Sequence, residues 1–134
     1  MEREELTSSK KKYALFIGRW QNWHKGHEWL INQQLNQGKN VWVAIRDVQQ
    51  DENNPKTAHQ ILKELSNEPF FTNNFDKILL SIIPDIESVN YGRGVGYDVI
   101  YHEPPTDVAV ISGTAIRTGH MKPDGTITYD ETKG

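Results

Sequence analysis

Residues 13–35 constrain the fold of this chain more than any other stretch. They open with an unbroken apolar run at residues 13–17, which is typical of a strand buried on both faces. Gly18 ends the run, a loop rich in aromatic residues follows, and from Glu28 onward apolar side chains recur at the spacing of one helical face. The stretch therefore predicts a strand, a loop and a helix, with His-Lys-Gly-His at residues 24–27 where the loop meets the helix.

A junction of this kind favours binding of an anion. In open α/β folds the carboxyl ends of the strands and the free N–H groups of a helix start meet there. Gly26 lets the backbone come close to a phosphate, and the imidazoles of His24 and His27 can donate to its oxygens without a fixed charge. Two alternatives stay open: solvated or capping histidines, and half of a zinc site. Zinc is the weaker alternative, because the chain has no cysteine and no His-Glu-x-x-His, so we predict no protein-held metal.

Length and charge narrow the class of protein. The 134 residues make one ordinary domain and are too few for two cores. A formal net charge of −3 with mixed signs argues against nucleic acid, because nucleic-acid-binding domains usually present a basic face. The chain has no cysteine, and no apolar stretch approaches the roughly 20 residues of a membrane span, so we expect a cytoplasmic protein with no membrane partner. Residues 1–12 indicate a flexible tail rather than a basic binding patch, which leaves the domain at residues 13–134.

The remaining chain alternates between strand and helix patterns. Predicted strands lie at residues 41–45, 77–83 and 107–111, and predicted helices lie at residues 57–67 and 112–120. Strands that alternate with helices form parallel sheets, so we expect a single α/β domain. Residues 99–101 are predicted to be either a short strand or a helix end before Pro104 and Pro105.

Polar groups follow the second predicted strand. Arg46 and Asp47 stand at its carboxyl end, where they either line the site or form a solvated ion pair. The polar loop at residues 49–55, with Asn54, then lies over the same edge of the sheet. Thr57 is placed to cap the next helix.

A glycine-rich segment at residues 91–97 follows the third predicted strand. It is not a dinucleotide fingerprint, because that motif belongs at the first strand-to-helix turn and places its third glycine one position later. The segment indicates a flexible loop. Tyr91, Arg93 and Tyr97 are nevertheless suited to stacking on a base and contacting a phosphate.

Two motifs carry a resemblance to a known family. Gly18-Arg19-Trp20-Gln21-Asn22-Trp23-His24-Lys25-Gly26-His27 resembles the Gly-Arg-Phe-Gln-Pro-Phe-His-x-Gly-His signature of the HxGH nucleotidyltransferase superfamily, in the form of archaeal-type nicotinamide mononucleotide adenylyltransferases. Ile111-Ser112-Gly113-Thr114-Ala115-Ile116-Arg117 resembles that family's Ile-Ser-x-Thr-x-Ile-Arg motif. With weaker echoes at residues 54–57 and 83–87, the resemblance spans about residues 13–120. It implies a doubly wound, Rossmann-like domain of the HUP type with a parallel sheet. It also implies that the segment 54–57 closes over substrate as a lid, and the alternative that Thr57 only caps the next helix stays open.

The resemblance also implies a reaction. A phosphate of the acceptor, nicotinamide mononucleotide, attacks the α-phosphorus of ATP, pyrophosphate leaves, and NAD is formed, with Mg²⁺ carried by the triphosphate. The implied catalytic residues are His24, His27 and Arg117. The implied nucleotide-binding residues are Gly18, Arg19, Trp20, Gln21, Lys25, Gly26, Ser112 and Thr114, and the acceptor-binding residues are Asp47, Asn54, Tyr91, Arg93 and Tyr97.

The chain departs from the family pattern at two places. Asn22 stands where the family has proline, and the glycine-rich residues 91–97 replace a region in which the family has a tryptophan that helps hold the nicotinamide ring. Two alternatives to the adenylyltransferase therefore stay open. One is a cytidylyltransferase that acts on a polyol or choline phosphate, and the other is a non-catalytic nucleotide-binding regulatory module. The sequence does not decide the oligomeric state, and a homo-oligomer stays open.

Overall fold

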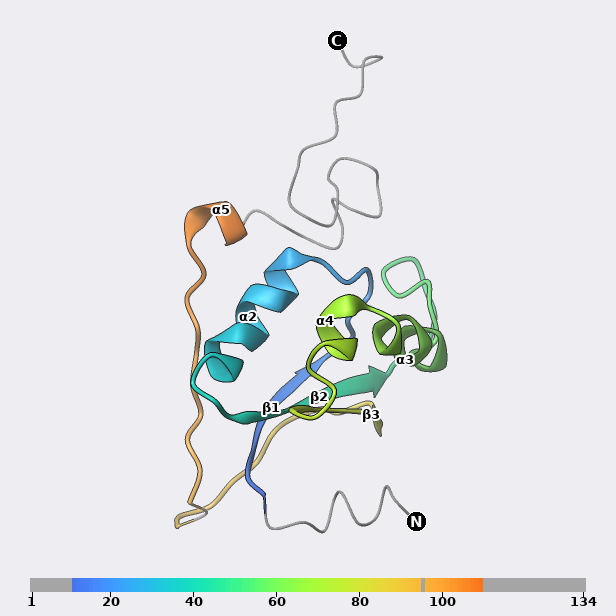
Figure 1. Cartoon of the computed structure of the whole chain (residues 1–134). Coiled ribbons are helices and arrows are strands. Elements are labelled where there is room, and N and C mark those ends of the chain that lie inside the picture. The colour runs from blue at the N-terminus through green and yellow to red at the C-terminus, as the bar shows by residue number, and fades with distance from the viewer. Residues whose placement is uncertain (1–10, 95, 110–134) are drawn as a thin grey trace.

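The computed structural model of the chain describes residues 11–94 and 96–109 (Figure 1). The regular elements in chain order are β1 (Tyr13–Gly18), α2 (Lys25–Leu35), β2 (Asn40–Asp47), α3 (Ala58–Ser66), α4 (Pro69–Thr72), β3 (Ile78–Pro84) and α5 (Thr106–Ala109). The predicted strands at residues 13–17, 41–45 and 77–83 and the helix at residues 57–67 are confirmed to within about two residues at each end.

The three strands form one parallel sheet in the order β1-β2-β3. In its register Ala14 pairs with Val41, and Val43 pairs with Leu80. Parallel neighbours require a crossover, and α2 links β1 to β2 while α3 and α4 link β2 to β3. Figure 1 shows all three helices on the same side of the sheet, as two right-handed crossovers in the same direction require. The predicted α/β class with a parallel sheet is therefore confirmed, here with three strands.

The core lies between this helical layer and the sheet. Val41, Val43 and Ile45 of β2 are buried against α2 and α3, where Ile31 and Ile61 are also buried. Burial of each large aliphatic side chain stabilises the fold by about 1.5–3 kcal/mol relative to its exposure to water. This packing holds β2 at the centre of the sheet and fixes the carboxyl ends of β1 and β2 next to each other.

The other face of the sheet is less covered than the sequence predicts. Leu15 of β1 is 47% exposed, although its run of apolar residues predicts burial on both faces. The reason is that all helices packed on the sheet within residues 11–94 lie on one side of it (Figure 1). On the open face the indole N–H of Trp42 donates to the hydroxyl of Ser81 at 2.7 Å, which links β2 to β3.

Local signals explain where the helices begin and end. The Thr57 hydroxyl accepts from the amide N–H of Gln60 at 3.1 Å, and the Gln60 side chain accepts from the Thr57 N–H at 2.7 Å, a capping box that starts α3. Gly38 has φ 76° just beyond α2, which is the backbone conformation that glycine adopts readily after a helix. The one-turn helix α4 was not predicted, although Pro69 occupies one of its first two positions.

The prediction of a strand at residues 107–111 is wrong for the part that the structure describes. Residues Thr106–Ala109 form the one-turn helix α5, which starts after two prolines, and the N–H of Val108 donates to the carbonyl of Pro105 at 3.0 Å. Residues 99–101 form neither the short strand nor the helix end that was predicted. Residues 110–134, which include the predicted helix 112–120, lie outside the described part. Within residues 11–94 and 96–109 no helix has the length and apolar character needed to cross a membrane.

The segment after β3 runs away from the carboxyl edge of the sheet. Figure 1 shows it passing to the opposite end of the sheet, turning there near residues 91–97, and returning to α5. On the return His102 stacks on Phe16 of β1, with ring centroids 6.4 Å apart. This path decides which of the predicted site residues can meet.

Candidate functional site

The β1–α2 loop, residues 19–24, has an unusual backbone. Trp20 and Asn22 have φ values of 52° and 63°, in the left-handed region that costs a residue with a side chain roughly 1–2 kcal/mol. The Trp20 indole N–H donates to the buried carbonyl of Ala44 in β2 at 2.9 Å, which holds the loop in this shape. A Cβ on Gly18 would lie 2.9 Å from the Trp20 ring, so glycine is needed where the ring folds back over the end of β1.

Gln21 joins this loop to the β2–α3 loop. Its side-chain amide donates to the carbonyl of Lys56 at 2.9 Å, and its carbonyl accepts from the Lys56 N–H at 3.1 Å. Both ends of the amide are thus occupied by backbone. Gln21 therefore holds two loops together at the carboxyl edge of the sheet, which is a different task from the direct nucleotide contact that the motif implies.

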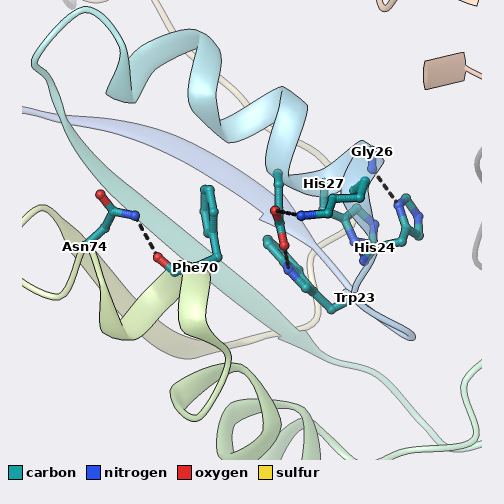
Figure 2. A network of polar contacts seen from close by, with 8 residues as sticks. Trp23, His24, Gly26, His27, Phe70 and Asn74 are labelled. Atoms are coloured by element: carbon teal, nitrogen blue, oxygen red, sulfur yellow. Dashed lines mark hydrogen bonds and ion pairs between the residues drawn. The ribbon is translucent and has the colours of Figure 1, made fainter. Parts of the chain in front are cut away.

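His24 and His27 cap the start of α2 reciprocally (Figure 2). The Nδ1 atom of His24 accepts from the N–H of Gly26 at 3.1 Å, and the Nδ1 atom of His27 accepts from the N–H of His24 at 3.3 Å. A neutral imidazole has one N–H, so the hydrogen-bond pattern assigns it to Nε2 in both rings. The two rings stack with centroids 3.7 Å apart and planes inclined by 19°.

Both histidines are neutral at pH 7. Burial lowers the pKa of His24 from 6.5 to about 4, partly opposed by the negative charge of Glu28. Burial and the neighbouring His24 lower the pKa of His27 to about 3. The pair therefore offers neutral hydrogen-bond donors at the positive end of a helix, which is a suitable environment for phosphate oxygens.

The backbone N–H groups of the first turn contribute less than the sequence suggests. The Gly26 N–H donates to His24, and the N–H groups of His27 and Glu28 both donate to the carbonyl of His24, at 3.0 and 3.3 Å. Gly26 was expected to let the backbone come close to an anion, but its N–H already donates to His24 as part of the helix cap. The imidazole Nε2–H groups are then the donors that the capping leaves available.

Aromatic rings hold the histidine pair from the side. Trp20 meets the His27 ring edge-on at 5.0 Å between centroids, and Trp23 lies 5.0 Å from it on a tilted plane. Trp23 in turn packs against Phe71 at 4.8 Å and Phe70 at 5.7 Å, both from α4. The unpredicted helix α4 therefore buttresses the ring that contacts His27.

One acidic side chain lies beside the pair. Glu28 accepts from the Trp23 indole N–H at 2.9 Å through Oε2, and from the Lys25 ammonium at 3.2 Å through Oε1. The side chain of Lys25 is exposed and forms an ion pair with Glu28. The role of Glu28 was not predicted, and its only sequence signal is an acidic residue in the first turn of a helix.

The β2–α3 loop, which Gln21 joins to the β1–α2 loop through Lys56, contains the predicted residue Asn54. The Asp51 carboxylate accepts from the backbone and side-chain N–H groups of Asn54 at 2.8 and 3.0 Å, which is the main reason that the pKa of Asp51 is lowered, and Arg19 lowers it further. Asn54 is buried, and its Oδ1 has no hydrogen-bond partner among the described residues. This loop must therefore shift before that oxygen can meet a ligand.

The other predicted residues take no part in the contacts described above or lie outside the described residues. Asp47 is exposed at the end of β2, and its neighbour Arg46 pairs with Asp85 at 2.7 Å rather than with Asp47. Tyr91 and Tyr97 contact each other, with centroids 6.1 Å apart, in the turn that Figure 1 shows at the opposite end of the sheet from the β1–α2 loop. The structure thus does not bring the turn with Tyr91, Arg93 and Tyr97 to the histidines. Ser112, Thr114 and Arg117 lie outside the described residues.

Within residues 11–94 and 96–109 no group of three or more His, Cys, Asp or Glu side chains is arranged to hold a metal ion. Comparisons of the chain with protein-family models, with curated proteins and with solved structures each find no match.

Proposed function

We propose that the chain is a nucleotidyltransferase of the HxGH type that joins the AMP part of ATP to nicotinamide mononucleotide and releases pyrophosphate. One observation carries the proposal: the stacked, neutral pair His24 and His27, with both Nε2–H donors free of the capping contacts at the start of α2. The pair stands after the first strand of a parallel sheet, where α/β domains bind their ligands. In this proposal the full domain is doubly wound.

The reaction needs no nucleophile from the protein. An oxygen of the acceptor phosphate forms a bond to the α-phosphorus of ATP, the bond from that phosphorus to the oxygen bridging to the β-phosphate breaks, and the electron pair leaves with pyrophosphate. Catalysis then depends on alignment and on donors placed where negative charge grows. A single such donor is worth about 10²–10³ in turnover, and His24 and His27 supply two of them.

The other phosphate contacts come from the resemblance. It assigns the outer phosphates to Arg19 and Arg117 and the hydroxyl contacts to Ser112 and Thr114. Mg²⁺ neutralises charge on the phosphates when it arrives with ATP. Glu28, the carboxylate beside the histidines, has both oxygens engaged by Trp23 and Lys25, so the surroundings fit a magnesium ion held by phosphate oxygens and water rather than by the protein.

Side-by-side initial-rate assays test the proposal. We expect ATP with nicotinamide mononucleotide to release pyrophosphate and form NAD faster than CTP with glycerol 3-phosphate or phosphocholine forms its CDP product. A preference for the CTP pairs would support a cytidylyltransferase instead. Binding of ATP without pyrophosphate release for any acceptor would support a regulatory module.

Matched variants test the role of the histidines. Asparagine at position 24 or 27 places an amide oxygen near the position of Nδ1, which keeps the helix cap, but it lacks the Nε2–H group. We expect His24→Asn and His27→Asn each to lower turnover by at least about 100-fold. Thermal unfolding measured at pH 8 checks that each variant is folded. Normal turnover in folded His27→Asn would show that the histidine only caps the helix.

A further inference from the structure

The carboxylate of Glu28 stands in an unfavourable place for a phosphate site. It belongs to the first turn of α2 and follows His27 directly in the chain. A free carboxylate there would repel a polyphosphate that approaches the imidazole N–H groups. The structure instead engages its two oxygens separately, Oε2 by the Trp23 indole and Oε1 by Lys25.

The two partners of Glu28 differ in how firmly they are held. Trp23 is buried, and Figure 2 shows its ring between His27 and Phe70. Phe71 also contacts the ring, so this packing holds the indole with its N–H directed at Glu28. Lys25 has a side chain that is 60% exposed. An exposed ion pair of this kind contributes little to stability, because water screens the two charges. Lys25 can therefore change partner at little cost, whereas Trp23 cannot.

We propose that Trp23 is a positioning residue whose indole N–H holds the Glu28 carboxylate in place and so frees Lys25 to exchange Glu28 for a phosphate group of the ligand. The inference rests on the proposed function, because it assumes a polyphosphate ligand at His24 and His27. Phenylalanine, which the resembling motif has at this position, fills the same space but has no N–H. In a phenylalanine variant Lys25 is the only remaining partner of Glu28 among these contacts and stays with it.

Binding of inorganic tripolyphosphate, measured by calorimetry at low salt, tests this exchange. We expect Trp23→Phe to weaken binding about tenfold, in line with the loss of one charge-assisted contact. Lys25→Gln should weaken binding by a similar factor in the wild type and have no further effect in Trp23→Phe. Glu28→Gln introduced into Trp23→Phe should restore wild-type binding, because Lys25 is then released.

The outcomes separate this inference from the proposed function. Equal binding by Trp23→Phe and the wild type, failure of Glu28→Gln to rescue, or an equal loss from Lys25→Gln in both backgrounds would each overturn the role of Trp23. Absence of tripolyphosphate binding by the folded wild type would overturn the phosphate site and this inference together. If the binding pattern is as expected but no acceptor releases pyrophosphate, the inference stands and the proposed transferase activity fails. Near-ultraviolet circular dichroism confirms that each variant is folded.

Discussion

Acidification from pH 7 to pH 5 should destabilise this fold through His24 and His27. In the unfolded chain each histidine binds a proton as the pH falls below its ordinary pKa of 6.5. In the folded chain burial keeps both rings neutral down to about pH 4 for His24 and about pH 3 for His27. Stability that is fully present above pH 6.5 is therefore lost as the pH falls toward those lowered values.

The size of this loss of stability follows from how far the pH lies below the ordinary histidine pKa of 6.5. Each pH unit below 6.5 costs about 1.4 kcal/mol for each histidine, so at pH 5 each lowers the free energy of unfolding by about 2 kcal/mol. The two together cost about 4 kcal/mol, which is a large share of the roughly 5–15 kcal/mol that stabilises an ordinary domain. Asp51 does not contribute in this window, because its pKa is lowered from 3.8 and its stabilising effect is lost only in stronger acid.

Urea unfolding at pH 7, 6 and 5, followed by the fluorescence of the four tryptophans, measures this loss directly. The matched control is the double variant His24→Asn/His27→Asn, which keeps an amide oxygen to cap α2 but has no titrating ring. We expect its free energy of unfolding to change by less than about 1 kcal/mol over the same range. A flat profile in the wild type, or an equal slope in the double variant, would refute the assignment of neutral, buried histidines.

Three further predictions concern the loops that hold the site. Gly18→Ala should lower the free energy of unfolding by about 1–3 kcal/mol in urea, because its Cβ meets the Trp20 ring at 2.9 Å, and an unchanged midpoint would contradict that contact. Gln21→Ala should speed hydrogen exchange of the Lys56 amide. Exchange at the wild-type rate would mean that the two hydrogen bonds between Gln21 and Lys56 do not hold the loops together. Asn22→Pro should cost about 3 kcal/mol or more in the same urea assay, because proline cannot adopt φ 63°, and a stable variant would show that the loop has another path.

The parts of the fold that local sequence determines were predictable. The apolar run of β1 and the cap at Thr57 specify their elements through short-range patterns, and both are present where expected. Helix α4 has four residues and no side-chain cap, so it depends on burial of Phe71 rather than on a periodic pattern. Val108 and Ala109 are apolar enough for a strand, but the two prolines at 104 and 105 and the acidic Asp107 in the first turn suit a helix start.

The candidate site was predictable in its residues but not in its contacts. The spacing of His24 and His27 at a strand-to-helix junction identifies them as candidate hydrogen-bond donors to an anion. Their role as caps of their own helix depends on the orientation of the imidazole rings, and the spacing of the two residues does not determine that orientation. The role of Glu28 depends on the direction of the Trp23 indole, and that direction is set by Phe70 and Phe71, which follow almost 50 residues later in the chain.

The backbone conformation of Asn22 indicates which residue roles of the resembling motif can apply to this chain and which cannot. Proline, which the motif has at this position, is restricted to φ near −65°, whereas Asn22 has φ 63°, so a loop with proline cannot follow the same path. On the path observed here the polar groups of Trp20 and Gln21 bind the backbone of Ala44 and Lys56. Their substitution should therefore change stability before it changes affinity for a nucleotide. His24 ends this loop and His27 lies in α2, and the cap between them is formed by contacts among His24, Gly26 and His27 that do not involve position 22. The histidine pair is therefore the part of the motif whose chemistry is most readily carried over to this chain.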